Sequence, residues 1–279
     1  MIEPTTDVGP PSAHGVEVDQ LVAGQGPALV SPAIMSQFWA DISFVHWRVE
    51  PELLVPFMPP GARPAIHDGS AWVGLLPFRM QRAGFGPGPA VPFFGTFWET
   101  NVRLYSTDAK GRPGVVFLSL EAQRLLVVLG ARAAFNVPYY WARMTGCSRA
   151  SSAGAPGSGS DAGVEVRYES RRLRPLGLRR GRELPVSALT VEVGAPIPSP
   201  SDTELFLSAR FGLHTQIAGR GVWVPNTHRP WPLRSATVVH LGDQLVAATG
   251  LPDLPALREP DHVMFSRGVH TRFGFPQFT

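Results

Sequence analysis

The sequence contains one lysine, Lys110, since 24 of its 25 basic Lys and Arg residues are arginines. Lys110 lies in the run 108–113 (DAKGRP), which is typical of a turn that water reaches freely. A lysine amine attacks a carbonyl only when burial or a neighbouring cation lowers its pKa. The sequence therefore disfavours a mechanism in which a lysine forms an imine with its substrate.

Cysteine is as scarce as lysine, with Cys147 alone. A single cysteine excludes an internal disulfide framework and any metal site built from several cysteines. No His, Asp and Glu spacing matches a zinc motif such as H-E-x-x-H, and no G-x-S-x-G segment marks a serine nucleophile. No Gly-Lys-Ser/Thr follows the glycine-rich run 84–95, which excludes a phosphate-binding loop there. We predict no metal and no cofactor.

Long apolar runs and a clear nucleic-acid signature are also missing. No segment reaches the roughly 18 apolar residues that cross a bilayer, and no basic and then apolar leader opens the chain. The net charge is +3, but most of the excess falls in the run 167–182, where seven arginines accompany one aromatic residue, Tyr168. That run favours a solvated hairpin over a nucleic-acid surface. We predict a cytoplasmic protein without membrane or nucleic-acid partners, and a homo-oligomer remains open.

Glycine and proline are abundant, at 29 each, and 44% of the residues are hydrophobic. This composition favours short strands joined by many turns around a sizeable core. We identify about ten strands and a few short helices, and predict a mainly β (α+β) fold that closes, or nearly closes, into a barrel. One domain is expected over residues 31–279, after a flexible arm at 1–30. A Ser/Gly-rich flexible insertion is expected at 145–163.

The segment 99–105 (ETNVRLY) could carry chemistry. Alternate residues of a strand share a face, so Glu99, Asn101, Arg103 and Tyr105 form a polar row behind an apolar one. Facing solvent, this row would belong to an ordinary surface strand. Facing a barrel interior, its charges would have to be paired or hold a ligand, and Arg103 with Glu99 would clamp a carboxylate or an enolate. His228 and Trp231 lie among prolines, where stabilisation of a turn is at least as good an interpretation as contact with a ligand.

Several segments together resemble a bacterial family of uncharacterised proteins, the YqjF-like group of the acetoacetate decarboxylase-like superfamily. The segments are FVHWRVEPELLVPFMPPG, AWVGLLPFRM, ETNVRLY, GRPGVVFLSLEA, ARAAFNVPYYWARM, HRPWPL and FSRGV, spread over about residues 35–275. The resemblance implies a single β-barrel-like domain with a central cavity.

The resemblance also implies where the chemistry of the decarboxylases would lie. In those enzymes a segment similar to Gly-Arg-Glu and then Pro-Lys-Lys carries the lysine that forms the imine. Here the similar segment is Gly130-Ala131-Arg132 followed by Pro138-Tyr139-Tyr140, so tyrosine replaces lysine. The cavity is expected to persist and the imine chemistry to be lost.

Two functions follow as hypotheses. The first is a small-molecule enzyme, lyase-like or isomerase-like, acting on a carbonyl or carboxylate metabolite. Glu99 and Tyr139 would transfer protons, and Arg103 or Arg132 would hold an oxyanion. Asn101, Tyr140, His228 and Trp231 would contact the substrate. The second is a non-catalytic barrel that binds a small organic acid or an apolar metabolite. A perturbed acidity at Glu99 would favour the enzyme, and a wholly apolar interior the binder.

Overall fold

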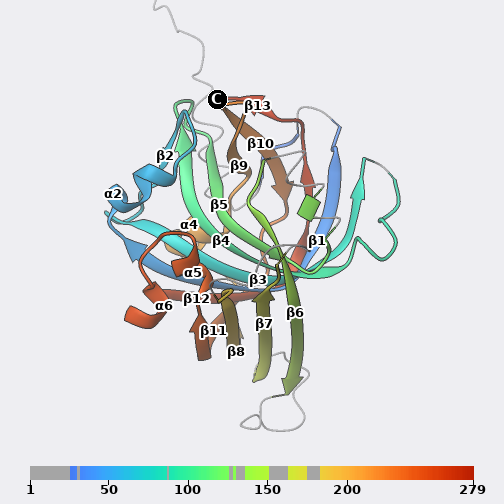
Figure 1. Cartoon of the computed structure of the whole chain (residues 1–279), viewed down its shortest axis with the longest axis vertical. Coiled ribbons are helices and arrows are strands. Elements are labelled where there is room, and N and C mark those ends of the chain that lie inside the picture. The colour runs from blue at the N-terminus through green and yellow to red at the C-terminus, as the bar shows by residue number, and fades with distance from the viewer. Residues whose placement is uncertain are drawn as a thin grey trace, which may run out of the picture.

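The computed structural model describes residues 26–29, 32–86, 88–125, 128–129, 136–150, 163–174 and 183–279. Strands dominate this part of the chain, as predicted, and the helices in it are short (Figure 1). The strands are β1 (Met35–Val49), β2 (Ala62–Pro64), β3 (Ala71–Phe85), β4 (Phe97–Asp108), β5 (Pro113–Ala122), β6 (Tyr139–Ala150), β7 (Val164–Arg172), β8 (Val186–Pro196), β9 (Gly212–Ile217), β10 (Arg220–His228), β11 (Leu233–Asp243), β12 (His262–Phe273) and β13 (Gln277–Phe278). The helices are α2 (Pro51–Leu54), the 3-10 turn η1 (Val55–Phe57), α4 (Asp202–Ser208), α5 (Leu245–Ala248) and α6 (Leu254–Leu257).

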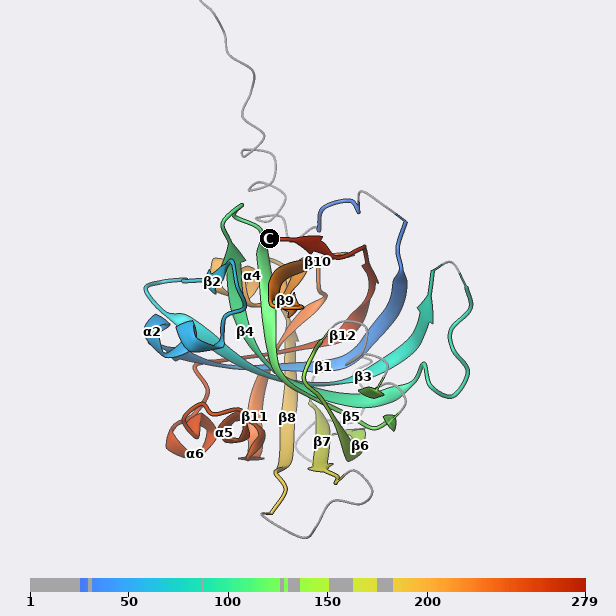
Figure 2. The same ribbon diagram turned by 45° about the horizontal axis from the view of Figure 1, so that its top comes forward.

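The strands form one sheet that closes on itself twice, instead of a simple barrel. The order β13-β10-β9-β5-β6-β7-β8-β11-β12-β1-β3-β4-β2 is supplemented by the pairings β10–β12 and β5–β4. One closed path runs β12-β1-β3-β4-β5-β9-β10, which we call the cavity ring. The other runs β5-β6-β7-β8-β11-β12-β1-β3-β4, which we call the filled ring. In Figure 2, β1 and β3 cross between the two groups of strands that complete these rings.

The strands shared by both rings are buried on both faces. On β4, Val102 and Leu104 join the hydrophobic core of the filled ring, which also takes in Val191 of β8 and Phe265 of β12. The alternate residues of β4 face the cavity ring, and Phe97 packs there in a second core. Because one face of β4 points into each ring, neither face is exposed to solvent, and the polar row of β4 is buried.

A bulge in β1 changes which alternate residues face the cavity. Asp41 has a positive φ of 45°, and the register with β3 shifts between Ala40 and Val45. The shift reverses the alternation, so Trp39 and Ile42, which differ by three positions, both line the cavity. Gly268 of β12 lies opposite, where a Cβ atom would collide with the carbonyl of Trp39.

Some local expectations hold and others change. Ser201 and Glu204 form the expected capping box of α4, with both reciprocal bonds present. The expected insertion begins later than position 145, because β6 continues to Ala150 in pairing with β7. Positions 151–162 of that insertion, most of the helix expected at 124–135 and most of the expected arm at 1–30 lie outside the described residues.

Candidate active site

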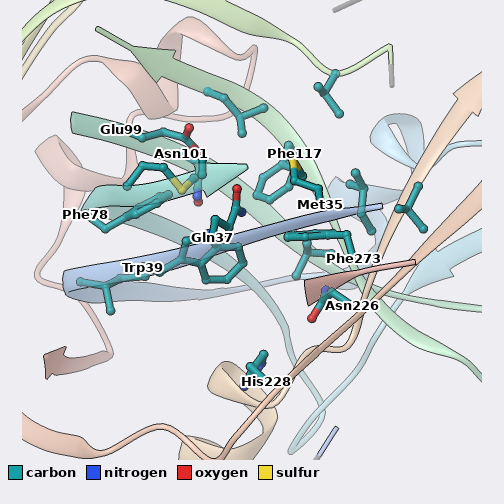
Figure 3. Close-up of a pocket in the computed structure, with 18 of the residues that line it drawn as sticks. Met35, Gln37, Trp39, Phe78, Glu99, Asn101, Phe117, Asn226, His228 and Phe273 are labelled. Carbon is teal, nitrogen blue, oxygen red and sulfur yellow. The ribbon is translucent and has the colours of Figure 1, made fainter. Parts of the chain in front are cut away.

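The cavity ring encloses a pocket of about 380 Å³. Pockets for drug-sized ligands measure roughly 300–1,000 Å³. Its wall is mostly aromatic and aliphatic, and includes Trp39, Phe78, Phe117 and Phe273 (Figure 3). Phe85 lines the pocket and is 71% exposed, so the pocket reaches solvent at the end of β3. Because the wall is mostly apolar, each polar group in it has few hydrogen-bonding groups nearby.

Three residues of the polar row on β4 line this pocket. Glu99, Asn101 and Arg103 are all at most 5% exposed, so the surface-strand interpretation is wrong. Tyr105, the next in the row, is completely buried beyond the pocket wall, where its hydroxyl lies 2.5 Å from His46 Nε2 and donates to the Leu207 carbonyl. The alternation of β4 therefore delivers three polar groups to one apolar chamber.

Glu99 forms a buried pair with Tyr139. Tyr139 opens β6, which starts parallel to β5 with Leu120 opposite Tyr139. Its hydroxyl donates to Glu99 Oε2 over 3.0 Å. Burial raises the pKa of Glu99 to about 8, although the Tyr139 bond lowers it. Burial and the neighbouring carboxyl raise the pKa of Tyr139 well above its ordinary value. At neutral pH the pair is a carboxylic acid and a phenol, both neutral.

Arg103 turns away from Glu99. Its Nε and Nη2 donate to the Tyr105 hydroxyl over 3.1 and 2.9 Å, and Nη2 also donates to the Leu207 carbonyl over 2.8 Å. Sequence reasoning had joined Arg103 and Glu99 in one clamp. The structure separates them, because they are four residues apart on an extended strand and the Arg103 side chain leans toward Tyr105.

A second guanidinium group lies beside Arg103. Arg210 also lines the pocket, donates from Nε to the Phe206 carbonyl, and packs 3.9 Å from the Phe206 ring. Burial lowers the pKa of Arg210 to about 10, which leaves it charged at neutral pH. Within the described part of the chain, neither Arg103 nor Arg210 forms an ion pair. Two cations without a carboxylate partner, close to an apolar chamber, favour an anionic ligand.

Three buried polar atoms of the wall also lack a partner among the described residues. They are Trp39 Nε1, Asn101 Oδ1 and His228 Nε2. His228 Nδ1 lies 2.7 Å from the Arg229 carbonyl. Burial lowers the pKa of His228 to about 4, although hydrogen bonds to the backbone of Arg229 and Arg210 raise it, so the ring is neutral at neutral pH. Buried polar atoms are nearly always hydrogen-bonded in native proteins. Their gathering around one chamber is typical of a site that a polar ligand or water completes.

The remaining predicted site residues divide into three cases. His228 and Trp231 line the pocket, and Trp231 also donates to the Ser208 carbonyl over 3.0 Å. Tyr140 does not line the pocket. Because it alternates with Tyr139, its ring lies on the other side, 3.6 Å from the Arg172 guanidinium carbon. Arg132 lies outside the described residues.

Sequence reasoning missed four polar residues of the wall. They come from β1, the end of α4, the segment after it and β10, and are Gln37, Ser208, Arg210 and Asn226. Figure 3 shows the Gln37 side chain in the middle of the labelled group. Two of them, Gln37 and Asn226, could have been found as polar residues at the ends of apolar strands. Arg210 follows a helix and carried no signal.

Among the described residues, no group of three His, Cys, Asp or Glu side chains is placed to hold a metal ion. In the same part of the chain, no helix is long and apolar enough to span a membrane.

Comparison with known proteins identifies the family of the chain. A model of an uncharacterized conserved protein family, DUF2071, matches residues 36–270. The protein YqjF of Bacillus subtilis (strain 168) is 30% identical over 204 residues, which are 73% of this chain and 76% of YqjF. The chain belongs to the DUF2071 family. The resemblance to the YqjF-like group is thereby confirmed.

Solved structures share the fold of this DUF2071 protein. The enduracididine biosynthesis enzyme MppR, complexed with pyruvate, aligns with a TM-score of 0.56 at 18% identity over 90% of this chain and 92% of MppR. An acetoacetate decarboxylase-like enzyme from Sphingomonas wittichii RW1 gives 0.56 at 15% identity, over 90% and 95%. Acetoacetate decarboxylase from Legionella pneumophila gives 0.51 at 13% identity, over 100% and 98%. The predicted acetoacetate decarboxylase-like fold is confirmed.

Proposed function

We propose that this DUF2071 protein is an enzyme that transfers protons on a small organic acid bound in the cavity, without a covalent lysine intermediate. The observation that carries the proposal is the buried Glu99–Tyr139 pair, which faces the same chamber as the uncompensated Arg103 and Arg210. Carboxylates recognised by arginine and proton donors with raised pKa are two recurring parts of enzymes acting beside a carbonyl. The MppR complex with pyruvate supports a keto acid as the ligand class.

The chain's own residues have distinct parts in this proposal. Protonated Glu99 donates its proton to a carbonyl oxygen or a carbon of the substrate, and the Tyr139 hydroxyl stabilises the carboxylate that remains. The Glu99 carboxylate then takes back a proton from the substrate or from water. A raised pKa of about 8 places Glu99 close to the pH at which either direction is efficient. The reaction class is a lyase or isomerase step next to a carbonyl.

Proton exchange tests the proposal before the natural reaction is known. In D₂O near pH 8, the protein is expected to catalyse deuterium incorporation next to the carbonyl of some acid in a panel of keto acids, followed by proton NMR. Glu99→Gln is expected to lower the exchange rate by roughly 10²–10⁴-fold, because glutamine neither gives nor takes the proton. Lys110→Arg, remote from the cavity, is the matched control and is expected to exchange like the wild type.

The alternative, a non-catalytic binding barrel, is favoured by the mostly apolar wall. It predicts that acids bind and that no member of the panel exchanges deuterium, with equal affinities in the wild type and in Glu99→Gln. That outcome would replace the catalytic proposal with the binding one.

Borohydride reduction in the presence of pyruvate or acetoacetate is expected to leave the intact mass of the protein unchanged. Lys110 lies at the exposed turn between β4 and β5, where its Nζ donates to the Phe278 carbonyl over 3.4 Å. Imine formation needs an amine that burial or a neighbouring cation activates, and the Lys110 side chain is exposed to solvent instead of enclosed in the cavity. A stoichiometric mass increase in the wild type that disappears in Lys110→Arg would contradict this expectation and restore an imine mechanism.

A further inference from the structure

The polar groups of the cavity fall into two ends. The proton end consists of Glu99 and Tyr139, joined by their hydrogen bond. The cation end consists of Arg103 and Arg210. His228 lies near it: burial lowers the pKa of His228, and the charge of Arg103 lowers that pKa further. Each end is directed into the same chamber. A ligand that satisfies both must span the interval between them.

That interval is long. Glu99 and Arg103 are four residues apart on β4, and an extended strand rises about 3.3 Å per residue, so their backbones are about 13 Å apart. The Arg103 side chain increases the separation, because its bonds to the Tyr105 hydroxyl draw it further along the strand. In Figure 3, Glu99 and His228 lie at opposite sides of the labelled group, with Gln37 and Trp39 between them. A molecule as short as pyruvate cannot reach both ends.

The wall between the ends is apolar, with isolated polar atoms. Phe78 pairs opposite Glu99, and Phe117 opposite Arg103, and both rings line the pocket. Asn101, halfway along the row, presents an unpartnered oxygen. Gln37 and the unpartnered Trp39 Nε1 also lie between the ends. The wall therefore favours a ligand whose middle is largely hydrocarbon and carries few hydrogen-bonding groups.

The two ends also differ in charge preference. The cation end keeps two guanidinium groups without a carboxylate among the described residues, and Nη1 of Arg103 has no partner there either. The proton end contains a carboxyl and a phenol and no cation, so a second anion placed there would be repelled as soon as Glu99 ionised. The two ends therefore favour negative charge on the ligand at the cation end only.

We propose that the cavity binds a long, largely apolar monocarboxylic acid, with its carboxylate against Arg103 and Arg210 and a carbonyl or hydroxyl group at Glu99 and Tyr139. This inference rests on the proposed function and narrows its substrate class: the reacting group lies at the opposite end of the ligand from the carboxylate, not beside it. Apolar burial along the wall supplies the affinity and the arginine contacts set the orientation.

Isothermal titration with a series of straight-chain acids, from acetate and pyruvate to octanoate and decanoate, tests the inference. Affinity is expected to rise about fourfold for each added methylene until the chain fills the cavity, because each methylene leaves water. Octanol, which matches octanoate in length without the charge, is expected to bind at least tenfold more weakly. Arg103→Met is expected to weaken octanoate at least thirtyfold (on the order of 10^1.5) and to leave octanol unchanged. Arg63→Met, an exposed arginine of β2, is the matched control.

The possible failures are distinguishable. Equal affinity for acetate and octanoate would overturn the long-ligand inference and leave an arginine-held acid, so the proposed function would stand. Equal affinity for octanol and octanoate in the wild type would overturn the assignment of the carboxylate to the cation end, whether or not Arg103→Met folds. Failure of every acid in the series to bind would overturn both this inference and the proposed function.

Discussion

Replacing Glu99 with glutamine is expected to stabilise the protein by an amount that grows as the pH rises from about 4.5 to about 8. In the folded chain the pKa of Glu99 is about 8, against 4.5 for an ordinary glutamate, because burial penalises the carboxylate. Between these values the unfolded chain binds fewer protons than the folded chain at this site, so the stability of the wild type falls as the pH rises. At 1.36 kcal/mol per pKa unit, the loss is on the order of 5 kcal/mol.

Urea denaturation of both proteins between pH 5 and pH 9 measures this effect. The difference in free energy of unfolding, glutamine variant minus wild type, is expected to increase up to about pH 8 and then level off. Glutamine can still accept the Tyr139 hydrogen bond, so the comparison isolates ionisation. Glu259→Gln, at an exposed position, is the matched control and is expected to give a difference within about 0.5 kcal/mol at every pH. A flat difference for Glu99 would show that its carboxylate is solvated.

Such a penalty fits a functional site better than a structural one. A protein selected for stability alone would put glutamine or a hydrocarbon at position 99, since an ionisable group there only costs stability near neutral pH. The buried Arg103 and the half-buried Arg210 carry a similar cost, because they too lack an opposite charge among the described residues. The three groups line one chamber, and a ligand that pairs with the arginines and exchanges a proton with Glu99 would compensate all of them.

The local pattern of β4 was readable from the sequence, because strand alternation has a fixed period of two. Glu99, Asn101 and Arg103 do share a face and do line the cavity. The sequence could not show that the polar face is buried as well as the apolar one, since this depends on a strand shared by two rings. Nor could it show that Arg103 leans toward Tyr105, because that direction is set by the Leu207 carbonyl from a distant helix.

Two other features of the site could not be predicted from a constant period of two along each strand, and the reason for each is clear. The bulge at Asp41 reverses the alternation of β1, so a constant period of two from Gln37 would have assigned Ile42 to the wrong face. Tyr139 was expected to transfer protons and Tyr140 to contact the substrate, but neighbours in a strand point to opposite faces. Once β6 is known to begin at Tyr139, only one of the two tyrosines can face the cavity.

Tyr140 instead packs on the ion pair between Arg172 and Glu121, which anchors the start of β6. Arg172 of β7 donates to both carboxylate oxygens of Glu121, with its Nη2 2.5 Å from Oε1 and its Nε 3.1 Å from Oε2. Ser119 also donates to Glu121, which is completely buried, and the Tyr140 ring covers the guanidinium group. The run 167–182 was expected to be a solvated hairpin. Within its described part, Tyr168 and Ser170 are buried and Arg172 has 13% of its side chain exposed, while 175–182 lie outside the described residues.

Replacing Arg172 with methionine is expected to lower the free energy of unfolding by about 3–5 kcal/mol, because it leaves the Glu121 carboxylate buried without its cation. Thermal and urea denaturation at pH 7 measure the loss, and Arg171→Met, at the exposed neighbouring position, is expected to change stability by less than about 0.5 kcal/mol. Adding Glu121→Gln to Arg172→Met removes the stranded charge, so the double variant is expected to recover at least about 1 kcal/mol of the loss. Equal stability of the single and double variants would show that water reaches Glu121.

The Arg172 substitution is also expected to affect Glu99, because β6 begins at Tyr139 and pairs there with β5. Loss of the anchor is expected to weaken the hydrogen bond from Tyr139 to Glu99. Since this bond lowers the pKa of Glu99, that pKa is expected to rise further.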